Sequence, residues 1–309
     1  MKHWIEAARL RTLPLSVSGI LVGSLYALNN PTNKILTPTQ VFDWRIFILA
    51  ILTTVGFQVL SNFANDYGDG VKGTDNEDRV GPQRAIQSGV ISPDAMKKAM
   101  YLTALLTFLC AVLLIYIAFT DKYLLFSLFF LILGIVAIAS AIKYTVGDSA
   151  YGYKGFGDVF VFVFFGLVST LGVNFLYSKQ FDWQLVLPAC AIGMLSAGVL
   201  NLNNMRDELS DAKAGKNTLV VKMGGQKAKI YHFFLVGGAM ILVLIFAIIY
   251  NKVGFRWDQY AFLAAYFPLM RHLRVVYLCD DNRRLDPQLK VLALSTFLLS
   301  AILALVMVF

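Results

Sequence analysis

The sequence is short of charged residues and of cysteine, and each shortage excludes a class of protein. Only 15% of its 309 residues are charged, whereas soluble globular chains carry about a quarter. The three cysteines lie in apolar segments without the spacing of disulfide pairs or metal ligands, which argues against a disulfide scaffold and favours a packing role. With 58% hydrophobic residues and a mean hydropathy of +0.65, the composition is that of an integral membrane protein.

The hydrophobic residues occur in long uncharged runs and not in alternating ten-residue segments, so helices rather than a barrel are predicted to span the membrane. The predicted fold class is all-α, a polytopic membrane protein in one domain over residues 1–309. The basic N-terminus resembles a signal peptide, but no clear cleavage site follows, and we expect a retained first helix. Nine spans are predicted, at 13–29, 45–65, 95–119, 123–142, 157–177, 183–204, 229–250, 259–278 and 289–308.

The distribution of basic residues predicts the orientation. Nine spans divide the loops into two sets, and 21 of the 27 Lys and Arg residues fall in one set, together with most acidic residues. Basic loops stay in the cytoplasm, so we expect a cytoplasmic N-terminus, an outer C-terminus and a functional cytoplasmic face. The net charge of +8 then reflects topology and attraction to anionic lipid. No basic tail or separate basic domain indicates a nucleic-acid partner.

Two aspartate-rich segments follow the second and sixth predicted helices. Both contain the pattern Asn-x-x-x-Asp, with Asn62 and Asp66 in the first segment and Asn203 and Asp207 in the second. The offset is 141 residues for each member, and the two helices have the same rank within a block of four. This predicts an internal repeat of two four-helix halves, about 13–142 and 157–278, followed by a ninth helix.

Carboxylates in such clusters repel one another unless a cation lies between them. A spacing of four places Asp207 and Asp211 one helical turn apart on one face. Carboxylate oxygens favour Mg²⁺, which shares its coordination shell with phosphate oxygens, so two facing clusters fit a diphosphate bridged by metal. For a single carboxylate a solvated loop charge explains the sequence equally well; the matched pair favours a site. Candidate cations for the same ligand are Lys72, Arg79, Arg84, Arg206, Lys213 and Lys216.

These motifs, the nine spans and the cytoplasmic placement resemble the intramembrane aromatic prenyltransferases of the UbiA superfamily, over essentially the whole chain. The first family motif is matched by Asn62, Asp66 and Asp69, and the second by Asp207 and Asp211. Within the superfamily, several stretches are similar to the menaquinone-pathway branch, which prenylates 1,4-dihydroxy-2-naphthoate. They are Arg9 to Pro14, Asn65 to Gly70 with Gly73-Thr74-Asp75, Gly81-Pro82 with Arg84 and Gln87 to Gly89, and Gly155 to Asp158.

The resemblance implies nine helices around a central cavity open to the cytoplasmic side, in a bacterial inner membrane. It also implies Mg²⁺ as cofactor and transfer of a polyprenyl group from polyprenyl diphosphate to the naphthoate, with loss of CO₂ and diphosphate, giving demethylmenaquinol. The implied metal ligands are Asp66, Asp69, Asp75, Asp207 and Asp211. Because Gly73 stands where some members carry another acid, the third acid of the site is open between Asp69 and Asp75, and we prefer Asp69. The implied substrate contacts are Asn62, Asn65, Lys72, Arg84, Lys143, Tyr144, Lys154, Asn203 and Arg206.

Some roles remain open at the level of sequence. Asp158 is a candidate base, and Lys154, Lys143 or Arg9 could pair with the carboxylate of the acceptor. Tyrosines on this side could shield the allyl cation, although each also suits an interfacial belt. Sister enzymes that prenylate 4-hydroxybenzoate, homogentisate, haem or chlorophyllide share both motifs. A secondary transporter would place ionisable groups near mid-span, where this chain has almost none, and a CDP-alcohol phosphotransferase matches only locally.

Overall fold

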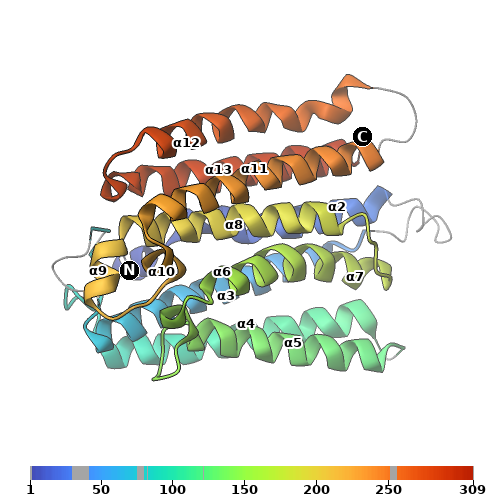
Figure 1. The fold of residues 1–309 in the computed structure, drawn as a ribbon. Coiled ribbons are helices and arrows are strands. Elements are labelled where there is room, and N and C mark those ends of the chain that lie inside the picture. Colours follow the sequence, from blue (N-terminus) through green and yellow to red (C-terminus); the bar gives the residue numbers. More distant parts are fainter. Residues whose placement is uncertain are drawn as a thin grey trace.

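The computed structural model describes residues 2–29, 42–74, 80–81, 83–120, 122–250 and 256–308. Within these ranges every regular element is helical and none is a strand (Figure 1). The all-α fold class predicted from the sequence is confirmed. The long helices run side by side along one common direction (Figure 1), the arrangement that long apolar helices adopt when a bilayer satisfies their outer surfaces.

Seven of the described helices are long and apolar enough to cross a membrane. Two of them are composite: α6 (Gly157–Val161), η5 (Phe162–Gly172) and α7 (Val173–Ser178) form one, and η7 (Asn282–Leu285) with α13 (Asp286–Val306) forms another. The other five are α3 (Trp44–Lys72), α4 (Pro93–Phe119), α5 (Leu124–Lys143), α8 (Val186–Arg206) and α11 (Gly225–Tyr250).

The first predicted span, 13–29, is α2 (Leu13–Asn29), and the eighth has a different form in the structure. The short elements α1 (Lys2–Ala8) and η1 (Leu10–Thr12) precede α2, and a bend of 55° between α1 and α2 makes the pair a broken span or a re-entrant segment. The eighth is divided between η6 (Trp257–Ala265), a tight 3-10 stretch, and α12 (Tyr266–Leu278). The described helices therefore give seven spans, or eight if the bent pair counts as one.

The first aspartate motif lies inside a helix and not in a loop, which corrects the predicted helix end at residue 65. Helix α3 continues to Lys72, and Gly73 ends it with a positive φ of 70°. The Gly73 N–H donates to the carbonyl oxygens of Asp69 and Gly70, which is how glycine commonly closes a helix. Asp66 and Asp69 are thereby held on a regular helical turn.

Close helix approach in the middle of the bundle depends on glycine. A Cβ on Gly166 of η5 would lie 2.5 Å from the Ala189 carbonyl oxygen, and one on Gly193 of α8 would lie 2.7 Å from the Phe162 carbonyl oxygen. Small residues let backbones in membrane bundles come this close. Helix α8 becomes the most deeply buried span, and it carries the second aspartate motif at its end.

The two motifs meet at one end of the bundle. The ends of α3 and α8, together with the short helices α9 (Glu208–Lys213) and α10 (Leu219–Met223), gather at the end where the N-terminus lies (Figure 1). Helix α5 packs on α3 and α4, and α8 packs on α11, α13 and η5. The space between these groups of helices becomes the site.

Candidate active site

The first motif places two buried carboxylates on the last turns of α3. Asp66 is 2% exposed and Asp69 is 1% exposed. Asn62, one turn earlier, donates its side-chain N–H to the carbonyl oxygen of Ala8 at 2.8 Å, which ties α3 to the N-terminal helix α1. Asn62 therefore positions the helix, while Asp66 and Asp69 require cationic partners because buried charge is costly when unpaired.

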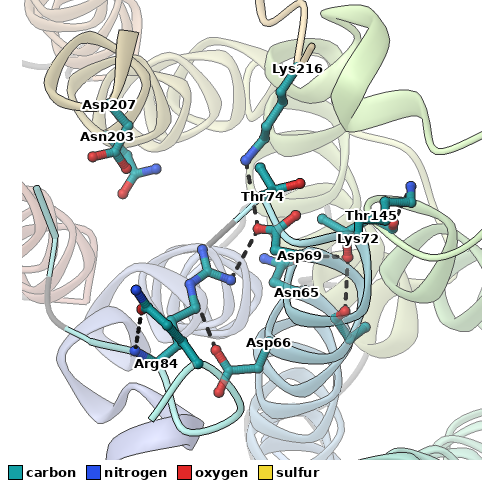
Figure 2. A network of polar contacts seen from close by, with 12 residues as sticks. Asn65, Asp66, Asp69, Lys72, Thr74, Arg84, Thr145, Asn203, Asp207 and Lys216 are labelled. Carbon is teal, nitrogen blue, oxygen red and sulfur yellow. Dashed lines mark hydrogen bonds and ion pairs between the residues drawn. The ribbon is translucent and has the colours of Figure 1, made fainter. Parts of the chain in front are cut away.

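Cations from distant parts of the chain supply those partners. Arg9 Nη2 lies 3.4 Å from Asp66 Oδ1, and Arg84 Nε lies 3.7 Å from the same oxygen. Arg84 Nη1 lies 3.1 Å from Asp69 Oδ2, so one guanidinium joins both acids (Figure 2). The Tyr153 hydroxyl donates to Asp69 Oδ1 at 2.8 Å. The negative charge of Asp69 raises the pKa of Tyr153, in addition to the larger effect of burial.

Lys216 connects the two motifs across the site. Its Nζ lies 3.7 Å from Asp69 Oδ2 and 3.7 Å from Asp211 Oδ1. Burial disfavours the charged ammonium, but Asp69 and Asp211 together keep the pKa of Lys216 above its ordinary value. Burial also raises the pKa of Asp211 to about 6, with Lys216 opposing the shift and Asp207 and Asp69 adding to it. Carboxylates 142 residues apart in sequence therefore share one cation.

The second motif differs from the first because its aspartate is neutralised by the preceding residue. The Arg206 guanidinium is fully buried and donates to Asp207 from Nε at 2.8 Å and from Nη2 at 2.6 Å. It also donates to Asn203 Oδ1 at 2.9 Å and pairs with Asp286 on α13. Arg206 thus fastens the end of α8 to α13. Figure 2 shows Asn203 and Asp207 across from the cluster around Asp66 and Asp69.

A cavity of about 340 Å³ extends from the motifs between the helices. Its polar end is lined by Arg9, Asn62, Asn65, Asp69, Arg84, Asn203, Asn204, Lys216 and Lys290. Deeper, the lining is mainly apolar and includes the aromatic residues Phe57, Phe130, Phe160, Phe164 and Phe165. A charged end joined to an apolar channel suits an amphiphile with an anionic head and a hydrocarbon tail.

The π-helical segment η5 keeps one wall of this cavity continuous. The lining residues Phe160, Phe164, Val168 and Gly172 recur at intervals of four, and Val161, Phe165, Ser169 and Val173 form a second such row. In an α-helix of 3.6 residues per turn, side chains four residues apart are separated by slightly more than one turn, so such a row moves slowly around the helix. In the wider turns of a π-helix the row moves around the helix in the opposite direction. Combining both helix types keeps both rows on the cavity.

Several predicted substrate contacts lie outside the cavity lining. Lys143 and Lys154 are exposed, and Lys72 donates to the carbonyl oxygens of Thr145 and Gly147 at 2.9 Å each, which holds the end of α5. Asp158 is buried and interacts with Tyr231 on α11. Arg206, as above, serves the α8 to α13 contact. The predicted residues that do line the cavity are Asn62, Asn65, Asp69, Arg84, Tyr144 and Asn203.

One predicted metal ligand lies outside the described residues, and the structure adds two lysines to the site. Asp75 lies outside the described residues, as does Arg79. Lys216 was one of several candidate cations in the sequence, and the structure makes it the link between the motifs. Lys290 is one of the 21 basic residues on the predicted cytoplasmic side, and it lines the cavity. No local pattern around Lys290 indicates this, because helix packing alone brings α13 to the site.

The carboxylates have the chemistry that Mg²⁺ requires. Among the described residues no three His, Cys, Asp or Glu side chains are grouped closely enough to hold a metal ion. One buried oxygen of Asp66 and one of Asp211 nevertheless have no hydrogen-bond partner, and buried carboxylate oxygens are normally satisfied. The donor set is entirely oxygen, which suits a hard cation. Asp66, Asp69, Asp207 and Asp211 fit such an ion in donor type.

Comparison with known sequences finds relatives along almost the whole chain. Residues 35–297 match the family model described as the UbiA prenyltransferase family. The chain is 42% identical to a 1,4-dihydroxy-2-naphthoate octaprenyltransferase of Haemophilus influenzae, over 99% of this chain and 95% of that protein. It is 40% identical to the 1,4-dihydroxy-2-naphthoate octaprenyltransferase of Escherichia coli, over 92% of this chain and 86% of that protein.

Solved structures share the fold at low sequence identity. A UbiA homolog from Aeropyrum pernix in its apo form superposes with a TM-score of 0.69 at 14% identity, covering 96% of this chain and 98% of that one. A UbiA homolog from Archaeoglobus fulgidus bound to DMAPP and Mg²⁺ gives a TM-score of 0.62 at 14% identity, covering 97% and 99%. The helical arrangement described above is therefore that of a known fold.

Proposed function

Since this chain belongs to the UbiA prenyltransferase family, we propose that it transfers a polyprenyl group from polyprenyl diphosphate to 1,4-dihydroxy-2-naphthoate, releasing CO₂ and diphosphate and giving demethylmenaquinol. The names of the two bacterial relatives support the acceptor. The observation that carries the proposal is the link from Asp69 through Lys216 to Asp211, at the charged end of a cavity with an aromatic and apolar interior.

The finer topology belongs to the same proposal. The bent unit of α1 and α2 would serve as the first span, and η6 with α12 as the eighth, which restores nine. The excess of Lys and Arg at the motif-bearing end supports a cytoplasmic cavity mouth in a bacterial inner membrane. The lipid bilayer, the polyprenyl diphosphate and the aromatic acceptor are then the partners of this chain.

The diphosphate would bind among the cations that now neutralise the carboxylates. Asp66, Asp69, Asp207 and Asp211 would hold Mg²⁺, which supplies charge withdrawal from the diphosphate; the archaeal homolog bound to DMAPP and Mg²⁺ supports that cofactor. Arg84 and Lys216 lie within 3.7 Å of Asp69 and can donate to phosphate oxygens instead. As the bond between carbon and oxygen breaks, they stabilise the charge that develops on the leaving group.

The remaining cavity would hold the hydrocarbon parts of both substrates. Phe160, Phe164 and Phe165 provide an apolar wall for the prenyl tail and exclude water from the allyl cation. The acceptor ring attacks that cation and loses its carboxylate as CO₂. Until then the carboxylate needs a cation, and Arg9 and Lys290 line the cavity whereas Lys143 and Lys154 do not. Arg9 and Lys290 are therefore the candidates for this role.

Product analysis tests the function directly. Membranes containing the protein are incubated with Mg²⁺, a long polyprenyl diphosphate and either dihydroxynaphthoate or 4-hydroxybenzoate, and products are identified by mass spectrometry. We expect a prenylated naphthoquinol without carboxylate, and its loss with EDTA. Prenylated hydroxybenzoate in place of that product would move the chain to a sister reaction, and no product with either acceptor would refute the proposal.

A further inference from the structure

The outward face of α12 combines apolar side chains with two arginines. Leu269, His272 and Val276 are buried at helical spacing and face the bundle. On the opposite face Phe267 is 70% exposed, Met270 54% and Leu278 61%. Arg271 and Arg274 are exposed and stand four residues after Phe267 and Met270, respectively, so they share this outward face.

Both arginines begin inside the end of α12, Arg271 about 10 Å and Arg274 about 6 Å from Leu278 at 1.5 Å per residue. His272 Nε2 lies 2.8 Å from His232 Nε2 of α11, so the two histidines are at the same depth. His232 is seven residues from the start of α11 at Gly225, and Arg271 is seven residues from the end of α12 at Leu278. At 1.5 Å per residue, the count along α11 and the count along α12 both place the Arg271 backbone about 10 Å from the ends of these helices. Those ends lie at the motif-bearing end of the bundle (Figure 1).

Three other exposed arginines among the described residues have a carboxylate beside them. Arg45 pairs with Asp43, Arg256 with Asp258 and Arg283 with Asp281, each two residues away. Arg271 and Arg274 form no ion pair with any described carboxylate. Arg271 and Arg274 thus lack a carboxylate partner on an apolar outward face, where an uncompensated charge is most costly.

The chemistry of this face identifies the missing partner. An arginine that begins in the hydrocarbon region extends its stem toward the headgroups. There its planar guanidinium meets phosphate oxygens, which it can bind in a bidentate manner. Two guanidinium groups one turn apart match the headgroup of an anionic lipid better than that of a zwitterionic one, whose own cation competes. The acyl chains of the same lipid would cover Phe267, Met270 and Leu278.

We propose that Arg271 and Arg274 form a binding site for one anionic glycerophospholipid on the outer surface of α12. The lipid completes the charge balance of a helix that is too short and too polar to be a span by itself, and it holds α12 against α11 near the His232 to His272 contact. The site is separate from the substrate cavity and does not depend on the proposed reaction.

The full chain can be tested as a purified protein. Retained lipids are measured by native mass spectrometry, and thermal stability is measured while phosphatidylglycerol or phosphatidylcholine is titrated. For wild type we expect preferential retention of phosphatidylglycerol and a rise in Tm with that lipid alone. In the double variant Arg271→Gln with Arg274→Gln, the apparent affinity for phosphatidylglycerol should fall about tenfold or more, as expected for loss of charge-assisted hydrogen bonds.

A matched control removes two positive charges elsewhere. Lys227 on α11 and Arg284 on η7 are exposed, and Lys227→Gln with Arg284→Gln should leave phosphatidylglycerol binding unchanged. An equal loss in the control would show general surface electrostatics and overturn the proposal. Stabilisation of wild type by inorganic phosphate as strong as that by the lipid would also overturn it, because the apolar part would then be irrelevant.

A conservative variant protects the test against misfolding. Arg271→Lys with Arg274→Lys keeps both charges and the flexible stems but removes bidentate donation. We expect a folded protein whose preference for phosphatidylglycerol persists with an affinity between those of wild type and the glutamine variant. The same preference and affinity in all three proteins would contradict the assignment.

Discussion

The two aspartate motifs share a pattern in the sequence but differ in how their charges are balanced. In the first motif, Asp66 and Asp69 face cations that arrive from other parts of the chain, chiefly Arg84. In the second, Asp207 is held by its neighbour Arg206, which is fully buried and also pairs with Asp286. The cations around the first motif can therefore exchange their carboxylate partners for a ligand, whereas Arg206 in the second motif joins α8 to α13. The same residue pattern has different structural roles at the two positions.

The largest effect on activity is expected at Asp66 and Asp207, because both are proposed metal ligands. Asp66→Ala and Asp207→Ala should each lower kcat/KM by at least about 10³-fold, since a lost metal ligand removes stabilisation of the leaving diphosphate. The assay is product formation in membranes with matched protein amounts. Asp258→Ala, at the exposed start of η6, is the control. Near-normal turnover by either variant would refute the shared role and the metal assignment with it.

Variants of Arg206 and Arg84 distinguish a role in fastening helices from a role in ligand binding. Arg206→Met leaves Asp207 and Asp286 without their buried partner and should lower the free energy of unfolding by about 3–5 kcal/mol. Arg84→Met should lower activity while changing the thermal unfolding midpoint much less, because Lys216 and Arg9 remain near Asp69 and Asp66. Thermal unfolding in detergent, measured beside activity, checks the pair. Equal destabilisation by both variants would remove the distinction between the motifs.

Lys216 tests whether the motifs act together. Lys216→Met should raise the KM for polyprenyl diphosphate by about 10- to 100-fold, the effect of losing a charge-assisted hydrogen bond. The KM for the acceptor should change little. Lys213→Met, three residues earlier and outside the cavity lining, is the comparison variant. An unchanged donor KM would mean that Lys216 serves only to neutralise Asp69 and Asp211.

Lys290 tests the acceptor side of the cavity and should give the smallest effect. Lys290→Met should raise the KM for dihydroxynaphthoate by about 5- to 10-fold, because one exposed cation facing a carboxylate contributes on the order of 1 kcal/mol. Inhibition by 1,4-dihydroxynaphthalene, which has no carboxylate, should not change. Lys227→Met is the matched control. Equal weakening of both aromatic compounds would exclude a role in carboxylate recognition.

Local sequence was sufficient for much of the fold. The apolar runs predicted helices at all seven described spans, and the motif letters predicted that Asp66, Asp69 and Asp211 would lie at one end. Helix ends were less well predicted: α3 extends to Lys72 because its last turns, although polar, are closed by Gly73. The eighth span was predicted as one apolar helix. Arg271 and Arg274 make its second half more polar, and the structure divides it into the 3-10 stretch η6 and the helix α12.

The candidate site was predicted less completely than the fold. Lys143 and Lys154 are candidate partners of the acceptor carboxylate in the sequence, and both are exposed outside the cavity lining. Asp158, a candidate base in the sequence, is buried and interacts with Tyr231. Position on the correct side of a membrane restricts a side chain to one layer, but the direction in which it points depends on the rotation of its helix and on neighbouring side chains.

The membrane class, the helical nature of the chain and the two carboxylate clusters follow from the sequence alone, because hydrophobicity and residue spacing are properties read along the chain. The fold is needed to show that Lys216 links Asp69 to Asp211, that Arg206 fastens α8 to α13, and that Lys290 lines the cavity. These contacts join residues that are far apart in sequence. Their existence depends on which helices pack together, and packing is set by the shapes of whole helix surfaces rather than by any local pattern.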